Sequence, residues 1–227
     1  MNLDLYAKAE DLLGIEEATD SLHRFYLRML SRQGITNFLD IGCGRGGLME
    51  AAGDSGMRCS GIDLSPVMVE AARAKGLDAR CMELCEVEGS YDAAVAVFDV
   101  LNFLDAAALE RFMECAAAVL KPGGLLLADI NTLHGFTNVA EGTMSSEDAT
   151  RFLSVDARFE NNELHTQFTL FEKRSEACWS REQDTIVQYF HPIKLFRKNP
   201  FFTLAEQHSI SLYDRDDKTF LVLKKRS

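Results

Sequence analysis

The stretch that most constrains the fold is FLDIGCGRGGL, residues 38–48, in which an apolar run leads into four closely spaced glycines. Gly42, Gly44 and Gly47 satisfy the GxGxxG pattern, in which glycines let the backbone turn sharply and approach a ligand without a Cβ in the way. A helix that begins directly after such a loop presents unpaired N–H groups to the ligand. The stretch therefore predicts a strand, a nucleotide-binding loop and a helix, in that order.

Strands and helices alternate along the residues that follow, and the strands are short apolar runs. Runs of this kind are typical of strands buried on both faces of a parallel sheet. Short, glycine-rich connections between them favour a doubly wound α/β architecture. Residues 208–214 and 218–225 add two strands near the C-terminus. We therefore expect a doubly wound, mostly parallel sheet, whose first five strands lie at residues 36–42, 57–64, 77–84, 91–101 and 125–131.

The pattern changes after residue 131. A polar loop, residues 133–148, precedes segments in which polar and apolar residues alternate, as they do in antiparallel strands. Asn161 and Asn162 mark a turn between two of these segments. We expect a small antiparallel β insertion at residues 151–191, after the fifth strand of the sheet.

The charge of the chain argues against a nucleic-acid partner. Residues 1–150 hold 11 Lys and Arg against 24 Asp and Glu, and such an acidic balance repels a polyphosphate. No stretch approaches the roughly 18 apolar residues that a membrane span needs, and the first residues, MNLDLYAKAED, lack the basic start and apolar run of a signal peptide. We therefore expect a cytoplasmic protein that binds neither nucleic acid nor membrane, and a homodimer stays open.

The six cysteines are scattered through the predicted strands and helices. This is typical of free thiols in a reducing compartment rather than of a disulfide framework. Cys81 and Cys85 form a CxxxC pair without His or Cys partners at metal-like spacing. We expect buried thiols there and no metal site.

Two carboxylates next to the glycine loop narrow the choice of ligand. Asp63 ends the second predicted strand, 21 residues after Gly42, where an acidic side chain accepts both hydroxyls of a ribose. Asp40 lies two residues before the loop and would repel a pyrophosphate, whereas it would attract an ammonium or sulfonium group. A structural role for Asp40, in which it caps amides of the loop, is the alternative.

These segments resemble the class I S-adenosylmethionine (SAM)-dependent methyltransferases. FLDIGCGRGGL resembles their first motif, GIDLSPVMVEAA the second, YDAAVAVFDVLNFL the fourth and LKPGGLLLADIN the segment that enters strand five, in register over about residues 36–131. The resemblance implies a seven-stranded sheet and one methyltransferase domain over residues 1–227. Within it, residues 35–131 would form the SAM-binding core and residues 151–191 a substrate lid.

The resemblance also implies which residues meet the cofactor. Asp40 and the loop Gly42–Gly47 would face the methionyl moiety, and Asp63 would hold the ribose. On the adenine side, family members often carry an acidic or amide residue just after strand three, where this chain has RCMELCEVE. The predicted cofactor-binding residues are Asp40, Gly42, Cys43, Gly44, Gly47, Asp63, Leu64, Met82, Glu83 and Phe98.

The acceptor site is predicted at the carboxyl end of the fourth strand, where ligand crevices form in open α/β sheets. Phe98, Asp99 and Asn102 follow that strand, although Phe98 could pack in the core and the two polar residues could cap a helix. Methyl transfer from a sulfonium depends mostly on positioning, and a general base matters only for a protonated or weakly acidic acceptor. We predict catalytic roles for Asp99, Asn102 and His191, with an ordinary hydrogen-bonded histidine as the alternative for His191.

The sequence thus predicts a SAM-dependent methyltransferase that acts by in-line displacement on N or O of a small-molecule acceptor. One alternative is an NAD-dependent oxidoreductase that uses the same glycine loop and Asp63. Another is a non-catalytic SAM-binding module, because no unmistakable general base is present. A tRNA or protein acceptor is a further alternative within the enzyme class.

Overall fold

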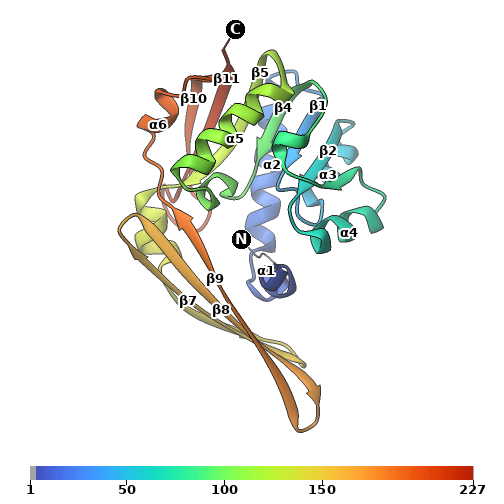
Figure 1. Ribbon diagram of the computed structural model, residues 1–227, viewed down its shortest axis with the longest axis vertical. Helices are drawn as coiled ribbons and strands as arrows, with labels where there is room; N and C mark the ends of the chain where they lie inside the picture. Colours follow the sequence, from blue (N-terminus) through green and yellow to red (C-terminus); the bar gives the residue numbers. More distant parts are fainter. Residues whose placement is uncertain (1–3, 227) are drawn as a thin grey trace.

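A central sheet of seven strands carries the site, in the order β10-β11-β5-β4-β1-β2-β3 (Figure 1). The computed structural model describes residues 4–226, so the predictions that include residues 1–3 and 227 lie partly outside the described residues. The five strands from β5 to β3 are parallel, and β11 runs antiparallel between β5 and β10. The predicted doubly wound, mostly parallel sheet is confirmed. Its strands are β1 (Asn37–Ile41), β2 (Arg58–Asp63), β3 (Ala79–Cys81), β4 (Tyr91–Ala96), β5 (Leu120–Asn131), β10 (Phe202–Ile210) and β11 (Lys218–Lys225).

Helices cover both faces of this sheet because successive strand side chains point to opposite faces. One buried cluster joins α5 to strand residues such as Leu39 and Leu126. The other joins α2 and α3 to Phe38 and Leu127, which are the chain neighbours of Leu39 and Leu126 and point to the opposite face of the sheet. The two clusters are the reason why the strands are apolar throughout. The covering helices are α2 (Glu16–Arg32), α3 (Gly47–Asp54), α4 (Pro66–Ala74) and α5 (Ala106–Val119).

Local sequence sets where the helices on the site side begin. Ser65 is the N-cap of α4 and its Oγ accepts the N–H of Met68, while Pro66 occupies the first turn, where it loses no hydrogen bond. Asp105 caps α5 in the same way, with its Oδ1 2.8 Å from the N of Ala108. These caps fix the start of each helix next to the strand end that precedes it.

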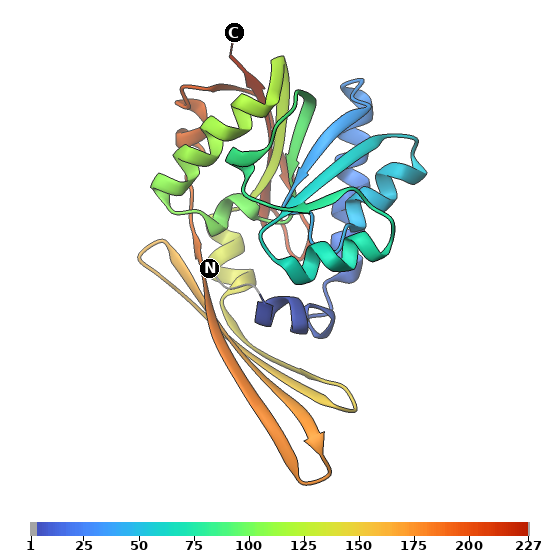
Figure 2. The same ribbon diagram turned by 45° about the vertical axis from the view of Figure 1, so that its right-hand side comes forward.

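A second sheet, antiparallel in the order β6-β7-β8-β9, projects from the first as a long ribbon (Figures 1 and 2). Asn161 and Asn162, with φ of 54° and 66°, form the predicted turn. The polar loop predicted for residues 133–148 is wrong, because that segment forms the π-helix η4 (Gly135–Ala140) and an extra edge strand. The strands are β6 (Gly142–Glu147), β7 (Arg151–Glu160), β8 (Glu163–Ser175) and β9 (Cys178–Tyr189).

The first described helices, α1 (Asp4–Ala9) and η1 (Glu10–Leu12), lie against this second sheet. The ring of Tyr6 meets that of Phe168 edge to face, with centroids 5.9 Å apart. An ion pair of 2.6 Å joins Arg151 to Asp11. Arg45 of the glycine loop donates to the carbonyl of Ala7 at 2.7 Å. The first described helices therefore bridge the ribbon and the central sheet.

The cysteines differ from the prediction. Cys85 of η2 (Leu84–Glu86) and Cys115 of α5 form a disulfide, and Cys81 is exposed rather than buried. The pairing joins elements that are packed together but separated by 30 residues, so the spacing of cysteines in the sequence carries no sign of it. Among residues 4–226, no helix is long and apolar enough to span a membrane.

Candidate active site

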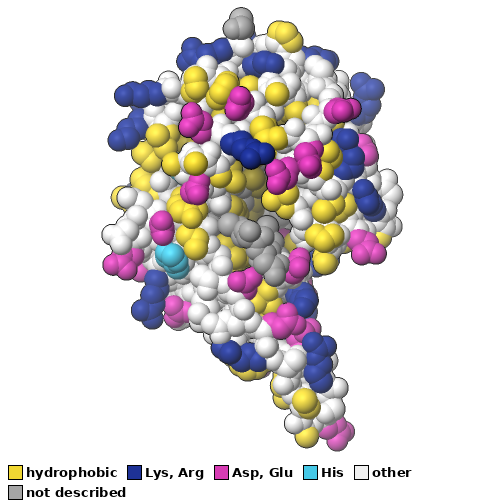
Figure 3. Space-filling view, in the orientation of Figure 1, with side chains coloured by type: hydrophobic (Ala, Val, Ile, Leu, Met, Phe, Trp, Pro, Cys, Tyr) yellow, Lys and Arg dark blue, Asp and Glu magenta, His cyan; other side chains and the backbone are white. Residues whose placement is uncertain are grey.

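A pocket of about 1010 Å³ opens at the carboxyl ends of the parallel strands, between the central sheet, the second sheet and α1. On the face shown in Figure 3, apolar side chains line the floor of a hollow and acidic side chains stand round it. All ten residues predicted to bind the cofactor line this pocket. Of the three predicted catalytic residues, Asp99 lines it as well.

The glycine loop is shaped by its contacts with β2. The N–H groups of Gly42 and Cys43 donate to the carbonyl of Ile62, at 2.8 and 3.0 Å. Gly42 has a φ of 77°, and a Cβ there would lie 2.9 Å from a methyl of Val100. A side chain at Gly42 would therefore collide with the segment after β4 as well as strain the backbone.

Asp63 is held by the glycine loop on one side and by the start of α4 on the other. Its Oδ2 accepts the N–H of Gly44 at 2.9 Å, and its Oδ1 accepts the N–H of Ser65 at 2.8 Å. Each carboxylate oxygen has two lone pairs, so one on each oxygen stays free for a ligand. The carboxylate is thus oriented before any ligand arrives.

Asp40 is a buried carboxylate on the wall of the pocket, with 3% of the residue exposed. Burial raises its pKa to about 7, and the nearby charge of Asp63 adds to the increase. Loss of solvation destabilises the anion, and a cationic ligand offsets that loss. The site therefore fits a ligand that brings a positive charge.

Residues after β3 form the side of the pocket where adenine is predicted to lie. Met82 and Glu83 line the pocket there. The side chain of Glu83 is 62% exposed, forms an ion pair of 3.6 Å with Arg111, and makes a capping box with Glu86 at the start of η2. Glu83 thus stands at the rim and stabilises the loop that borders the pocket.

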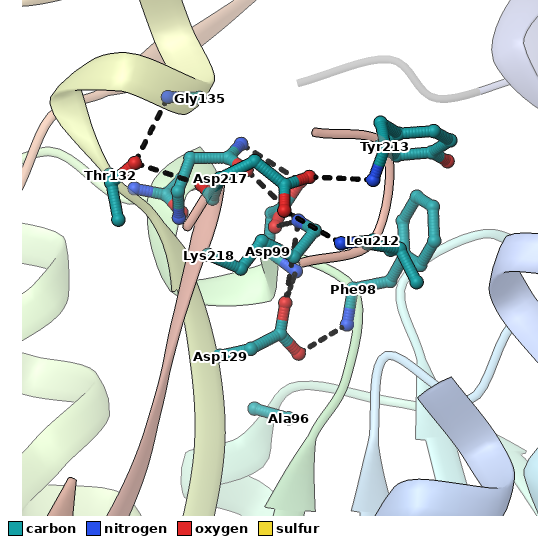
Figure 4. Close-up of polar contacts among 12 residues, drawn as sticks. Ala96, Phe98, Asp99, Asp129, Thr132, Gly135, Leu212, Tyr213, Asp217 and Lys218 are labelled. Carbon is teal, nitrogen blue, oxygen red and sulfur yellow. Dashed lines mark hydrogen bonds and ion pairs between the residues drawn. The ribbon is translucent and has the colours of Figure 1, made fainter. Parts of the chain in front are cut away.

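The segment after β4 has an unusual backbone. Phe98 and Asp99 both have φ of 65°, in the left-handed region that costs a non-glycine residue roughly 1–3 kcal/mol. The Asp129 carboxylate holds this shape, because it accepts the N–H of Phe98 at 2.8 Å and the N–H of Asp99 at 3.1 Å (Figure 4). Tyr26 donates its hydroxyl to the same carboxylate at 2.7 Å. The strain directs the Phe98 and Asp99 side chains toward the pocket, and both line it.

Lys218 completes this end of the pocket, although the sequence offered no reason to select it. It is 1% exposed and forms an ion pair with Asp99 (Figure 4). Asn131 links the two, since its Nδ2 donates to Asp99 at 3.0 Å and its Oδ1 accepts from Lys218 at 2.9 Å. In the sequence, Lys218 is a lysine at the start of an apolar strand. Ordinary strands also begin in this way, so the pattern does not single out this residue.

The ion pair sets the charge of both partners. Burial raises the pKa of Asp99 to about 6, while the Lys218 ammonium opposes that increase. Burial alone would lower the pKa of Lys218, but Asp99 and Asp129 outweigh it and raise the pKa above its usual value. The lysine is therefore charged, and Asp99 titrates close to neutral pH.

The geometry speaks against catalytic roles for Asn102 and His191. The Nδ2 of Asn102 donates to the carbonyl of Tyr189 at 2.8 Å, and the Nε2 of His191 lies 2.9 Å from the carbonyl of Leu104. Burial lowers the pKa of His191. Neither residue is among the described residues that line the pocket. Both tie η3 (Val100–Phe103) and its flanks to the end of β9, which is a structural task.

Two tyrosines that the sequence did not assign to catalysis also line this end of the pocket. Burial raises the pKa of Tyr6 well above its usual value and that of Tyr213 to about 12, so both are neutral donors. Asp217 accepts the N–H of Leu212 at 2.7 Å and that of Tyr213 at 3.1 Å, which fixes the loop that carries Tyr213 (Figure 4).

Comparison with known proteins agrees with this geometry. A family model described as a methyltransferase domain matches residues 38–124. A solved SAM-dependent methyltransferase from Clostridium acetobutylicum superposes with a TM-score of 0.80 at 16% identity, over 99% of this chain and 98% of that chain. Residues 38–124 thus match a methyltransferase domain, and the chain has the class I fold of SAM-dependent methyltransferases. The sugar N-methyltransferase KedS8 of Streptoalloteichus sp. shares this fold with a TM-score of 0.75 at 15% identity, over 100% of this chain and 94% of that chain.

Curated relatives match this chain over different lengths. A putative methyltransferase of Geobacillus sp. (strain WCH70) is 24% identical over 213 residues, which cover 87% of this chain and 86% of the relative. A ubiquinone biosynthesis O-methyltransferase of Xanthomonas oryzae pv. oryzae is 36% identical over 104 residues, 41% of this chain and 42% of the relative. The shorter match therefore covers less than half of each protein.

Proposed function

We propose that the protein is a SAM-dependent methyltransferase, that it acts on a small molecule and that the accepting atom is an amine nitrogen. The observation that carries this proposal is the charge of the acceptor end of the pocket. Asp99 turns a carboxylate toward the pocket there, and Lys218 is already engaged by it. An ammonium or amine that donates N–H groups suits such an end, whereas a carboxylate acceptor would be repelled.

The other cations that line the pocket are also engaged by carboxylates. Among the described lining residues, Arg45 pairs with Glu10 at 3.4 Å and Lys75 with Glu50 at 2.6 Å, and Arg111 pairs with Glu83. The pocket thus offers an acidic substrate little to bind to. KedS8 is named a sugar N-methyltransferase and CalS10 an amino pentose methyltransferase, and both share this fold. The ubiquinone relatives are O-methyltransferases, so a hydroxyl acceptor is the second candidate.

The residues of the pocket fit SAM. We assign the ribose hydroxyls to Asp63, whose two oxygens are already oriented, and the cationic methionyl part to Asp40 and the glycine loop. Met82 and Glu83 would border the adenine. When bound, SAM supplies an electrophilic methyl group on a sulfonium, and its bond to sulfur breaks as the bond to the acceptor nitrogen forms.

The residues of the chain then have three tasks in the reaction. Asp99, with a pKa of about 6, accepts a proton from the bound ammonium, so that the nitrogen lone pair is free. Tyr6 and Tyr213, as neutral donors, orient polar groups of the acceptor. The second sheet and α1 cover the pocket, and we assign them the exclusion of water. In this proposal, residues 35–131 bind SAM and residues 151–191 form the lid of a single domain.

The proposal is tested in two steps. Calorimetric titration of cofactor-stripped protein with S-adenosylhomocysteine (SAH), with NADH as the control, is expected to show binding of SAH alone. A panel of amines, hydroxylated compounds and carboxylic acids is then assayed for SAH release, and amines are expected to react fastest. Turnover of carboxylic acids alone would contradict the amine assignment, and binding of NADH alone would contradict the cofactor. The cytoplasmic location and the homodimer stay predictions.

A further inference from the structure

Lys218 is the buried cation at the acceptor end, and several groups converge on it. It is the first residue of β11, directly opposite Asn131 of β5. Its Nζ contacts the carboxylate of Asp99, lies 3.5 Å from Oδ2 of Asp129, and lies 2.9 Å from Oδ1 of Asn131. The ammonium also lies 5.2 Å from the centre of the Phe98 ring, within the range of a cation–π contact.

These contacts engage the ammonium on several sides. Asp99 and Asn131 accept hydrogen bonds from it, and Asp129 lies within ion-pair distance. The groups around Lys218 are therefore the ones through which its charge acts on the pocket.

The two carboxylates next to Lys218 differ in their other partners. Asp129 accepts two backbone N–H groups and the hydroxyl of Tyr26, three donors that do not depend on the lysine. Asp99 has one further donor, the Nδ2 of Asn131. If the ammonium were removed, two buried like charges would be left side by side, and a proton would bind to one of them. Asp99 would take that proton, because it has fewer donors.

We propose that Lys218 is a positioning residue for the methyl acceptor: it keeps Asp99 anionic, with the carboxylate turned to the pocket. The inference rests on the proposed function, in which Asp99 receives the proton of the acceptor. Loss of Lys218 would turn Asp99 into a neutral acid that cannot accept this proton. The titratable groups around the pair are Asp129 on β5, Tyr26 on α2, Tyr6 on α1 and Tyr213 in the loop before β11. Two more carboxylates lie one step further out: the charge of Asp217 affects Tyr213, and the charge of Asp40 on β1 affects Tyr26.

The first test measures the charge of Asp99 directly, without cofactor or acceptor. Protein labelled with 13C at the aspartate carboxyl carbon is titrated by NMR, and Asp99→Asn assigns the signal. In the wild type we expect a midpoint at about pH 6, and in Lys218→Met a midpoint higher by about one pH unit or more. Lys218→Arg keeps the cation and is expected to restore a midpoint close to that of the wild type. An unmoved midpoint in Lys218→Met would overturn the proposal.

The second test asks whether this charge reaches the acceptor position. Sinefungin carries an amine where SAM carries its transferable methyl group, and SAH has no group there. At neutral pH the preference for sinefungin over SAH is expected to fall about tenfold in Lys218→Met, because the charged hydrogen-bond partner becomes neutral. If Asp99 stayed ionised, removal of the lysine charge would raise this preference, which contradicts the proposal.

The two tests separate the inference from the proposed function. If neither SAH nor sinefungin binds the wild type, the cofactor assignment fails, while the NMR titration still decides whether Lys218 sets the charge of Asp99. A shifted titration with an unchanged sinefungin preference would show that Asp99 does not face the acceptor. That outcome would overturn the positioning role.

A stability measurement covers the case in which Lys218→Met folds poorly, since an unpaired buried charge destabilises a protein. Urea unfolding is compared near pH 5 and near pH 8 in both proteins. Proton uptake by Asp99 is expected to make the variant lose more stability than the wild type on going to the higher pH. Addition of Asp99→Asn is expected to remove the excess loss. Equal pH dependence in Lys218→Met and the wild type would contradict the proposal.

Discussion

In the proposed site, the buried carboxylate of Asp40 is expected to make the affinity for SAM depend on pH. Its pKa is about 7, because burial removes solvation and Asp63 adds a like charge. Only the ionised form attracts the cationic methionyl part of SAM. We therefore expect SAM to bind more tightly as the pH rises through 7, and Asp40→Asn to abolish this part of the dependence.

The size of the effect follows from the pKa. A group with a pKa of about 7 is about one tenth ionised at pH 6 and about nine tenths ionised at pH 8. If the ionised form alone binds, affinity rises about tenfold between these values, which is about 1.4 kcal/mol. A pKa one unit lower would move the increase to between pH 5 and pH 7, with the same size.

Calorimetry with SAM at several pH values measures this, in the wild type and in Asp40→Asn. The ligand has titrating groups of its own, but they contribute equally to both proteins. The difference in slope between the two proteins therefore reports Asp40. Identical slopes would refute the assignment of Asp40 to the cationic part of the cofactor.

Other predictions concern stability. The pKa of Asp40 is raised in the folded protein, so this residue favours folding below about pH 4, and that contribution is lost as the pH rises to about 7. Asp40→Asn should therefore be more stable than the wild type near pH 8 by roughly 1–4 kcal/mol. Near pH 4 no gain in stability is expected. Urea unfolding tests this, and a gain that is equal at both pH values would contradict it. Asp129→Asn should lower the free energy of unfolding by about 3 kcal/mol, because two N–H groups of the strained segment lose a charged acceptor. Tyr26→Phe should lower it by only about 1 kcal/mol. The reverse order in urea unfolding would show that Asp129 does not hold this segment. Asn102→Ala should lower stability by about 1–3 kcal/mol and leave calorimetric affinity for SAH unchanged, since its contacts are backbone groups of Tyr189 and Asn131; loss of SAH affinity in a folded variant would argue for a direct role in the pocket.

The sequence predicted those parts of the fold that depend on local patterns. Apolar strands with glycine-rich turns imply a parallel sheet, and Ser65 and Pro66 mark the start of a helix wherever the chain goes next. The extra strand β6 was missed because GTMSSE is polar and lies at a sheet edge, where burial leaves no pattern.

The candidate site was predictable only where motif and strand end coincide. Asp40 and Asp63 follow from their spacing to the glycines, and the structure brings both to the pocket. Lys218 lies 119 residues from Asp99, so only the tertiary fold shows that they meet. His191 and Asn102 show the opposite limit, because a polar residue near a crevice can equally face the protein interior, and the sequence does not orient its side chain.

The bridge formed by the first helices has a practical consequence. The carbonyl of Ala7 accepts a hydrogen bond of 2.7 Å from Arg45 of the glycine loop, and Lys8 forms an ion pair of 2.8 Å with Glu182 of the ribbon. Because α1 contacts both, a group attached close to this helix is expected to disturb the glycine loop and the ribbon together. The end of β11 lies on the far side of the central sheet (Figure 1). A tag attached after β11 is therefore the better choice for ligand-binding work.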